Sequence, residues 1–245
     1  MCAVAEVWKE NQVVADYLSR RQAIPFSEAQ SGVMLDVLAA GCESVGTFLD
    51  LGCGDGVLGA AMRARFPASR GVLLDFSEPM LRRAREMLAS EKDGLEFALA
   101  DYATSTWLAS VKMFAPFDAV VSGYSIHHQP DSRKRSLYAE IFALLRPGGW
   151  FVNVEHVAPA ASLTTAIFEG HFIDHAFAVE SARGTGRSRA QIADEFHRRP
   201  DKAANILAPV ETQCSWLRAA GFEEVDCFFK IHELAVFGGR RPSGL

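Results

Sequence analysis

Short apolar runs alternate with longer segments of helical periodicity over most of the chain. The segment after Gly56, for example, places Leu58, Met62 and Phe66 on one face of a helix. The runs with the length and composition of buried strands are 47–51, 71–75, 95–99, 117–123 and 150–154. An alternation of this kind predicts an α/β fold with a largely parallel sheet.

The helix expected from about Arg133 to Leu145 is followed by the sequence Arg146-Pro147-Gly148-Gly149. Pro-Gly-Gly ends helices and starts tight turns. We therefore expect a turn between this helix and a fifth strand that begins at Trp150.

The C-terminal part of the chain also has a clear pattern. An amphipathic segment over 210–220 is stopped by Gly221, and strand-like runs follow at 224–229 and 233–237. These runs predict a hairpin that completes the sheet, with the final strand antiparallel.

Two further segments fall outside the alternation. Residues 1–40 have helical periodicity that Pro25 interrupts, and we expect them to close over a pocket at the sheet or to cover the sheet edge. An apolar helix over 163–177 and an arginine-rich stretch after it are expected to form a lid that selects the substrate. The predicted organisation is a helical cap at 1–45, a core at 46–157 and 209–240, and a helical lid at 158–208.

Composition narrows the class of protein. The chain has 245 residues, of which 49% are hydrophobic, and this suits one α/β domain with an elaboration. The net charge of -5 argues against binding of duplex nucleic acid, which usually requires a basic face. Its scattered cysteines form no C-x-x-C pair, which argues against disulfides and zinc sites. With no secretory signal and no apolar run near ~18 residues, we expect a cytoplasmic protein with no membrane partner.

The stretch from Phe48 to Gly56 is an apolar run that breaks into alternating glycines. Such glycines let the backbone adopt positive φ and bring its N–H groups against a ligand. A dinucleotide fingerprint would need a third glycine where Val57 stands. Instead Asp50 precedes Gly52 by two residues, and a carboxylate so placed repels a pyrophosphate but holds the ammonium of an amino-acid moiety. The stretch resembles motif I of the class I S-adenosylmethionine (SAM) methyltransferases.

Asp75 ends the second apolar run, about twenty residues after the glycine turn. A carboxylate at the carboxyl end of the strand beside the first can accept both hydroxyls of a ribose. The alternative is that Asp75 only caps the following helix, but Ser77 is the better N-cap and Pro79 suits the first turn. We therefore expect Asp75 to hold the cofactor ribose.

Asp101 and Tyr102 follow the third run. In the methyltransferase pattern, an acid here bonds the adenine amino group, and the next side chain lies against the adenine ring. Asp101 is equally suited to N-cap the short helix that follows, so both interpretations stay open.

Aromatic and polar residues continue the fourth and fifth runs past their carboxyl ends. Tyr124 and His127 follow the fourth run, and Glu155 and His156 follow the fifth. Ligands of open α/β sheets lie at this edge, so we expect these residues near the methyl acceptor. A histidine, with a reference pKa near 6.5, is suited to act as a base there, whereas His128 is expected to pack or to cap.

Taken in order, these motifs resemble a class I SAM-dependent methyltransferase from about Thr47 to Gly239. The resemblance implies a Rossmann-like, doubly wound sheet of seven strands in the order 3-2-1-4-5-7-6, with strand 7 antiparallel. It also implies SAM as cofactor, S-adenosylhomocysteine as product and no metal. The residues implied for catalysis are His127, His156 and Tyr124. Those implied for the cofactor are Tyr17, Arg21, Asp50, Gly52, Cys53, Gly54, Asp75, Phe76, Ser77, Met80, Asp101, Tyr102, Ser122 and Gly123.

A narrower resemblance lies in the C-terminal third. Val210-Glu211-Thr212 and the sequence up to Phe222, with the neighbourhood of Arg21, look like the carboxy-SAM synthases of the tRNA wobble-uridine pathway. Those enzymes carry an arginine where this chain has Trp216, and an indole cannot replace a guanidinium fork. Ordinary methyl transfer is therefore our prediction, with Trp216 as an aromatic wall for the substrate.

A small-molecule acceptor, methylated on an O, N or C atom, is predicted. A base is needed only for a hydroxyl or a carbon acid. A tRNA acceptor and a non-catalytic SAM-binding protein are the alternatives, while the Asp50 spacing opposes an NAD-dependent oxidoreductase. His171 and His175 lack a third metal ligand at a suitable spacing, so we expect no metal site there. We expect the protein to be a monomer or a homodimer. The residues that favour tRNA, although such a run is more often a solvated face, are Arg183, Arg187, Arg189, Arg198 and Arg199.

Overall fold

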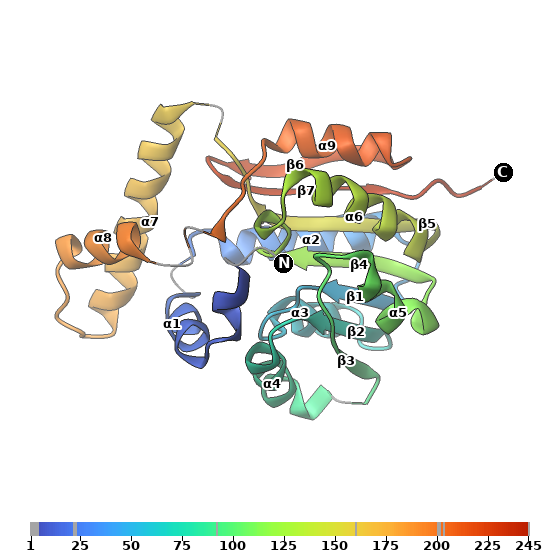
Figure 1. Cartoon of the computed structure of the whole chain (residues 1–245), viewed down its shortest axis with the longest axis horizontal. Helices are drawn as coiled ribbons and strands as arrows, with labels where there is room; N and C mark the ends of the chain where they lie inside the picture. Colours follow the sequence, from blue (N-terminus) through green and yellow to red (C-terminus); the bar gives the residue numbers. More distant parts are fainter. Residues whose placement is uncertain are drawn as a thin grey trace.

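A seven-stranded sheet forms the centre of the computed structural model (Figure 1), which describes residues 5–21, 24–91, 93–159, 161–199, 202 and 204–244. The strand order is β3-β2-β1-β4-β5-β7-β6, and β7 runs antiparallel to both of its neighbours. The predicted seven-stranded order and the antiparallel last strand are therefore confirmed. The strands are β1 Thr47–Leu51, β2 Arg70–Asp75, β3 Leu95–Leu99, β4 Phe117–Gly123, β5 Leu145–His156, β6 Glu223–Ile231 and β7 Leu234–Arg240.

Helices cover both faces of the sheet (Figure 1). The apolar residues of α2, α3 and α4 pack on one face, and those of α6 and α9 pack on the other. The α-helices are α1 Asn11–Arg21, α2 Ser27–Gly41, α3 Val57–Arg65, α4 Glu78–Met87, α5 Leu108–Val111, α6 Asp131–Leu144, α7 Ser162–Ala182, α8 Arg189–Arg198 and α9 Val210–Ala219. The 3-10 helices that matter for the site are η1 Ala5–Lys9 and η5 Ile126–His128.

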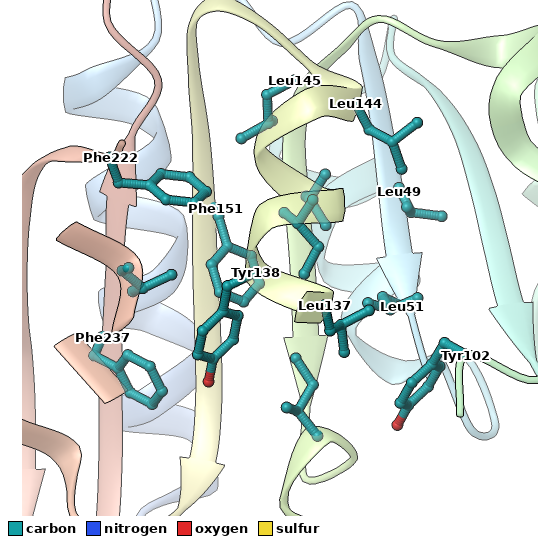
Figure 2. Packing of buried hydrophobic residues seen from close by; sticks show 14 of the residues in the cluster. Leu49, Leu51, Tyr102, Leu137, Tyr138, Leu144, Leu145, Phe151, Phe222 and Phe237 are labelled. Carbon is teal, nitrogen blue, oxygen red and sulfur yellow. The ribbon is translucent and has the colours of Figure 1, made fainter. Parts of the chain in front are cut away.

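Strand β1 shows why the apolar runs predicted strands so well. Leu49 and Leu51 pack with Leu137 and Tyr138 of α6 on one face (Figure 2), while Phe48 packs with the α2 and α3 side on the other. A parallel strand with helices on both faces must be apolar throughout, so its sequence is a continuous apolar run rather than an alternating one.

The prediction that strand β5 begins at Trp150 is wrong. Helix α6 ends at Leu144, and β5 begins at once with Leu145 opposite Phe117. The two glycines lie inside the strand, where the β4–β5 register shifts between Phe117 and Ala119. A Cβ on Gly149 would lie 3.0–3.1 Å from three backbone oxygens, so the chain needs glycine there for close strand packing rather than for a separate turn.

Helices α7 and α8 stand beside the sheet rather than on either face (Figure 1). They enclose a small apolar cluster of their own, with Ile173 and Ala176 from α7 against Ile192 and Phe196 from α8. No described helix is long and apolar enough to cross a membrane. The division into cap, core and lid stays a prediction, and the first four residues of the predicted cap lie outside the described part of the chain.

Candidate functional site

A cavity of about 360 Å³ opens at the carboxyl ends of the central strands. Parallel strands end at the same edge, so residues that follow β1, β2, β4 and β5 meet there, and α1 and α7 close the cavity from outside the sheet. The predicted site residues that line it are Tyr17, Arg21, Asp50, Gly52, Cys53, Gly54, Asp75, Phe76, Ser77, Met80, Gly123, Tyr124, His127 and His156. The cavity therefore joins most of the predicted cofactor residues to the predicted catalytic ones.

The glycine turn needs glycine for two different reasons. Gly52 has a φ of +71°, and a Cβ there would lie 1.9 Å from the Ser125 hydroxyl oxygen. Gly54 has a φ of +55°, and a Cβ there would meet no atom within 4 Å. Gly52 thus permits close packing, whereas Gly54 leaves the cavity floor open for a ligand.

The backbone N–H groups of the glycine turn were predicted to face a ligand, but three of them donate to groups of the protein itself. Gly52 and Cys53 donate to the Leu74 carbonyl at 2.8 and 2.9 Å, and Gly54 donates to Asp75 Oδ2 at 2.9 Å. The turn is therefore fixed by bonds to β2 rather than left with donors directed at a ligand.

The Asp50 carboxyl group is buried, and only one of its two oxygens has a hydrogen-bond partner among the described residues. Its Oδ2 accepts the Gly59 N–H at 2.9 Å, while its buried Oδ1 has no hydrogen-bond partner among the described residues. Burial raises the pKa of this carboxyl to about 7, and the negative charges of Asp75 and Asp55 add to the rise. A cationic donor in the cavity would satisfy Oδ1 and stabilise the charge, so the residues fit the ammonium of a methionine moiety.

Asp75 is held on both oxygens by backbone N–H groups, from Gly54 at 2.9 Å and from Ser77 at 2.8 Å. Burial raises the pKa of its carboxyl to about 6. The Ser77 side chain accepts from Met80 N–H at 3.3 Å, so Ser77 is the N-cap of α4 as predicted. Each carboxylate oxygen keeps acceptor capacity for a second donor from the cavity.

Helix α1 is tied to the glycine turn and to α8. Arg21 forms an ion pair with Asp55, the residue that follows Gly54. Arg20 lies 3.6 Å from Glu195 of α8, and both arginines line the cavity. Burial raises the Asp55 pKa, and Arg21 opposes that rise. The N-terminal segment therefore closes the cofactor end.

Three predicted cofactor residues lie outside the lining of the cavity. Ser122 is buried and donates to the Leu51 carbonyl at 2.7 Å. The Tyr102 hydroxyl bonds Ser125, so its ring is part of the core (Figure 2). Asp101 Oδ1 accepts the Ala103 N–H at 2.8 Å, and the next helix starts only at Ser105, so Asp101 is not its N-cap. Its charge nevertheless contributes to the raised pKa of Asp75, which places it near the cofactor end.

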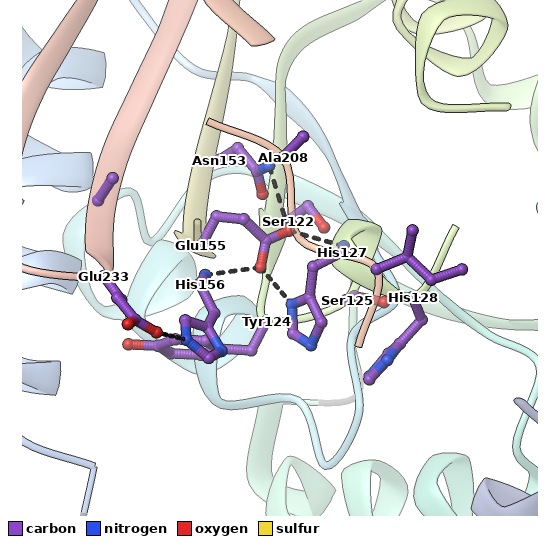
Figure 3. Close-up of polar contacts among 12 residues, drawn as sticks. Ser122, Tyr124, Ser125, His127, His128, Asn153, Glu155, His156, Ala208 and Glu233 are labelled. Carbon is purple, nitrogen blue, oxygen red and sulfur yellow. Dashed lines mark hydrogen bonds and ion pairs between the residues drawn. The ribbon is translucent and has the colours of Figure 1, made fainter. Parts of the chain in front are cut away.

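His127 forms a buried pair with Glu155 (Figure 3). Its Nδ1 lies 2.5 Å from Glu155 Oε1, and its backbone N–H donates to Oε2 at 3.1 Å. Glu155 also accepts the His156 N–H at 2.9 Å, and burial raises its pKa to about 7. Because Glu155 accepts these N–H bonds, we assign its ionised form, with the proton on His127 Nδ1.

The His127 ring is neutral in this arrangement. Burial lowers its pKa well below the usual value, and the nearby His156 and Lys134 charges lower it further, opposed by a hydrogen bond with Asn205. With Nδ1 as donor to Glu155, the lone pair lies on Nε2, and His127 lines the cavity. The lowered pKa makes this ring a weak base, so proton uptake from a group in the cavity depends on the Glu155 carboxylate, which lies beside Nδ1 and stabilises the resulting charge.

The other two predicted catalytic residues are held by different partners. His156 Nε2 lies 2.8 Å from Oε2 of Glu233, which belongs to the turn between β6 and β7 (Figure 3). Tyr124, with a φ of +50°, donates its hydroxyl proton to Gln30, and burial raises its pKa. Tyr124 thus keeps its proton and is a wall rather than a base. His128 lies 3.1 Å from the Ala204 carbonyl through Nδ1, as expected for a packed residue, and it also lines the cavity.

One sequence interpretation is wrong, and three residues of the cavity were missed. Trp216 packs on the α6–α9 side with the Arg135 guanidinium 5.0 Å from its ring centre, and it lies outside the lining of the cavity, so it is not a substrate wall. Sequence reasoning also missed Trp8, Phe168 and Asn205, which line the cavity. No local motif marks these residues, because they reach the cavity only through the packing of η1, α7 and the segment after α8.

The arginine-rich stretch is largely neutralised by acids. Arg187 pairs with Glu195, Arg189 lies 2.6 Å from Asp174, and Arg198 lies 2.7 Å from Asp194. Within the described ranges, no group of three or more His, Cys, Asp or Glu side chains could hold a metal ion.

The comparisons with known proteins agree with this geometry. A family model described as "Methyltransferase domain" matches residues 48–149. The ubiquinone/menaquinone biosynthesis C-methyltransferase UbiE of Desulfotalea psychrophila is 28% identical over 210 residues, which cover 82% of this chain and 75% of that enzyme. The demethylmenaquinone methyltransferase of Clavibacter sepedonicus is 31% identical over 179 residues, which cover 73% of this chain and 66% of that enzyme.

A solved structure shows the same fold. Human N-acetylserotonin methyltransferase in complex with SAM superposes with a TM-score of 0.64 at 13% identity. The match covers 98% of this chain but 59% of the human chain, so this chain spans less than two thirds of that enzyme's length. The family model and the two relatives, together with the strand order and the glycine turn, support a SAM-dependent methyltransferase domain of the class I fold in this chain.

Proposed function

We propose that the protein transfers the methyl group of SAM to a small-molecule acceptor bound over β4 and β5, by in-line displacement. The observation that carries this proposal is the continuous cavity that joins Asp50 and the glycine turn to His127. The sulfonium of SAM is itself a strong electrophile. The protein's tasks are therefore to align the acceptor and to exclude water.

At the cofactor end, Asp50 Oδ1 is the acceptor for the methionine ammonium because it is the oxygen without a described partner. Asp75 accepts the ribose hydroxyls with its remaining lone pairs, and Gly54 leaves room for the chain that connects the two. We assign the adenine amino group to Asp101, which lies beside Asp75 at the end of the neighbouring strand.

At the acceptor end, His127 Nε2 receives the acceptor's proton when that acceptor is a hydroxyl or a carbon acid. Glu155 holds the ring in one tautomer and stabilises the imidazolium that results. His156 and Tyr124 shape the cavity, since each is bonded to another protein group.

A small molecule suits the site better than tRNA. Four of the five arginines that favoured tRNA lie beside acids: Arg187, Arg189 and Arg198 pair with Glu195, Asp174 and Asp194, and Arg183 lies 3.4 Å from Glu180. The two curated relatives carry names from quinone biosynthesis, and both names describe methylation of small molecules. The relation to carboxy-SAM synthases, the cytoplasmic location and the oligomeric state stay predictions.

The test combines binding with turnover. Calorimetry should show SAM binding to the purified protein, and incubation with methyl-labelled SAM and a metabolite extract should give labelled small molecules. Ribonuclease treatment of the extract should leave that label unchanged. A label that disappears with ribonuclease would move the acceptor to RNA, and SAM binding with no transfer to either pool would favour the non-catalytic alternative.

A further inference from the structure

A wall of aromatic rings runs along the cavity from the cofactor end to the lid. Trp8 of η1 lies 5.6 Å from His128, ring centre to ring centre, and His128 lies 4.1 Å from His127. The series continues from His127 to His156 at 5.9 Å and from His156 to Phe168 of α7 at 5.3 Å. All five rings line the cavity, so their surfaces are offered to a ligand rather than used only in the core.

Two more aromatic residues extend this wall at its ends. Tyr17 of α1 meets Trp8 edge-on at 5.2 Å, and Phe172 of α7 lies 6.1 Å from Phe168. Both also line the cavity. Rings at such distances already contact one another, and a further ring laid against their free faces or edges gains offset or edge-to-face contacts of the same kind. A flat aromatic ligand would therefore gain contacts that a saturated ring of the same size would not.

Among the described residues that line the cavity, none offers a buried carboxylate to an ammonium ligand at the acceptor end. Glu155 is bonded to His127 at 2.5 Å and Glu233 to His156 at 2.8 Å, and both lie outside the lining of the cavity, including Glu233 Oε1, which has no described partner. Glu28 of α2 lines the cavity but is exposed to solvent. The group that is available is the neutral imidazole of His127, which accepts a proton from a hydroxyl.

We propose, on the basis of the proposed function, that the acceptor is a hydroxylated aromatic compound whose ring lies against the Trp8–Phe172 wall. Its hydroxyl proton moves to His127 Nε2 while an oxygen lone pair forms the new O–CH₃ bond. The S–CH₃ bond breaks, and its electron pair stays on sulfur to give S-adenosylhomocysteine. The imidazolium then releases its proton to solvent, so the products are an aryl methyl ether, S-adenosylhomocysteine and one proton.

The decisive experiment compares aromatic hydroxyl compounds with their saturated counterparts. Phenol and cyclohexanol, and 2-naphthol and decahydro-2-naphthol, are titrated by calorimetry into the 245-residue chain loaded with S-adenosylhomocysteine. We expect the aromatic member of at least one pair to bind about 10-fold more tightly. We also expect mass spectrometry to detect its methyl ether when SAM replaces S-adenosylhomocysteine.

Variants test whether the wall is the cause. Phe168→Leu and Phe172→Leu should each lower the affinity for the aromatic compound about 5-fold and leave that for SAM unchanged. Phe172→Tyr, which keeps the ring, should retain the wild-type preference. Phe142→Leu is the matched control, because Phe142 packs against Phe222 on the far side of the sheet and lies outside the lining of the cavity.

The outcomes distinguish a failure of the aromatic acceptor from a failure of the proposed methyl transfer. Equal affinities within every pair, or a preference that both leucine variants leave intact, would overturn the aromatic acceptor even when SAM binds and other molecules are methylated. Failure of SAM itself to bind would instead overturn the proposed function.

Discussion

The two ends of the cavity are built in different ways. The cofactor end is formed by Asp50, the glycine turn and Asp75, which belong to two adjacent strands and the turns that follow them. The acceptor end combines η5, the end of β5 and α7, and Trp8 of η1 joins the two ends, since its ring lies against His128 and its carbonyl accepts the Ser77 hydroxyl proton. The first end is a local motif on a parallel sheet, whereas the second exists only when the remote segments are packed.

Their electrostatics differ as well. At the cofactor end, the carboxyl pKa values of Asp50, Asp55 and Asp75 are all raised by burial. At the acceptor end, the carboxylates Glu155 and Glu233 are each paired with a histidine. The cofactor end thus favours a cation, and the acceptor end favours a neutral proton donor. Substitutions should therefore act on one end and spare the other.

The largest effect is expected for Asp75→Ala. The Asp75 carboxylate offers charged acceptors to two ribose hydroxyls, and hydrogen bonds to charged groups contribute about 1.5–3 kcal/mol each. Loss of both should weaken SAM binding at least ~100-fold, as measured by calorimetry. Asp226→Ala, which removes an exposed carboxylate from β6, is the control and should leave the affinity unchanged. An Asp75→Ala protein that binds SAM normally would contradict the assignment of the cofactor end.

His127→Ala should separate the two ends. Removal of a positioned base lowers turnover by about 100-fold or more for an acceptor that must lose a proton. SAM affinity should stay within about 2-fold of wild type, because His127 belongs to the acceptor end. The matched control is His175→Ala, an exposed position on α7. A loss of SAM affinity equal to the loss of turnover would show that the two ends are not independent.

The pH dependence of SAM binding should reveal the charge state of Asp50 at the cofactor end. The Asp50 carboxyl has a pKa raised to about 7, and the SAM ammonium favours its ionised form. Below that pH, binding must release the Asp50 proton, so SAM affinity should rise by up to about 10-fold per pH unit between pH 6 and 7 and level off above. Calorimetry across this range measures the slope.

Asp50→Asn is the control for that slope, since the amide has no proton to release in this range. Its SAM affinity should be lower at pH 8 and nearly flat from pH 6 to 8, apart from the smaller contribution of Asp75 with its pKa of about 6. If the wild-type protein is also flat over this range, Asp50 does not bind the ammonium in its charged form.

Most strands could be predicted because parallel strands covered on both faces must be apolar throughout. The same reasoning failed at 145–149, where Pro-Gly-Gly has two structural uses. These residues suit a turn, but here they let β5 pass close to the backbone of β4 at Gly149. Trp216 was misplaced for a related reason, since an aromatic residue on an amphipathic helix does not reveal which cavity lies nearby.

The sequence by itself determined the glycine turn and the carboxylates of Asp50 and Asp75, because these follow from local backbone geometry and from the meeting of parallel strands at one edge. The sheet order came from the resemblance of the ordered motifs to the methyltransferase family. Only the tertiary structure decided that Glu155 holds His127, that Arg21 reaches Asp55, and that Trp8 and Phe168 continue one aromatic wall. These contacts join segments far apart in the chain. Their partners are fixed by how helices pack around the sheet, and no periodicity or spacing along the chain records that packing.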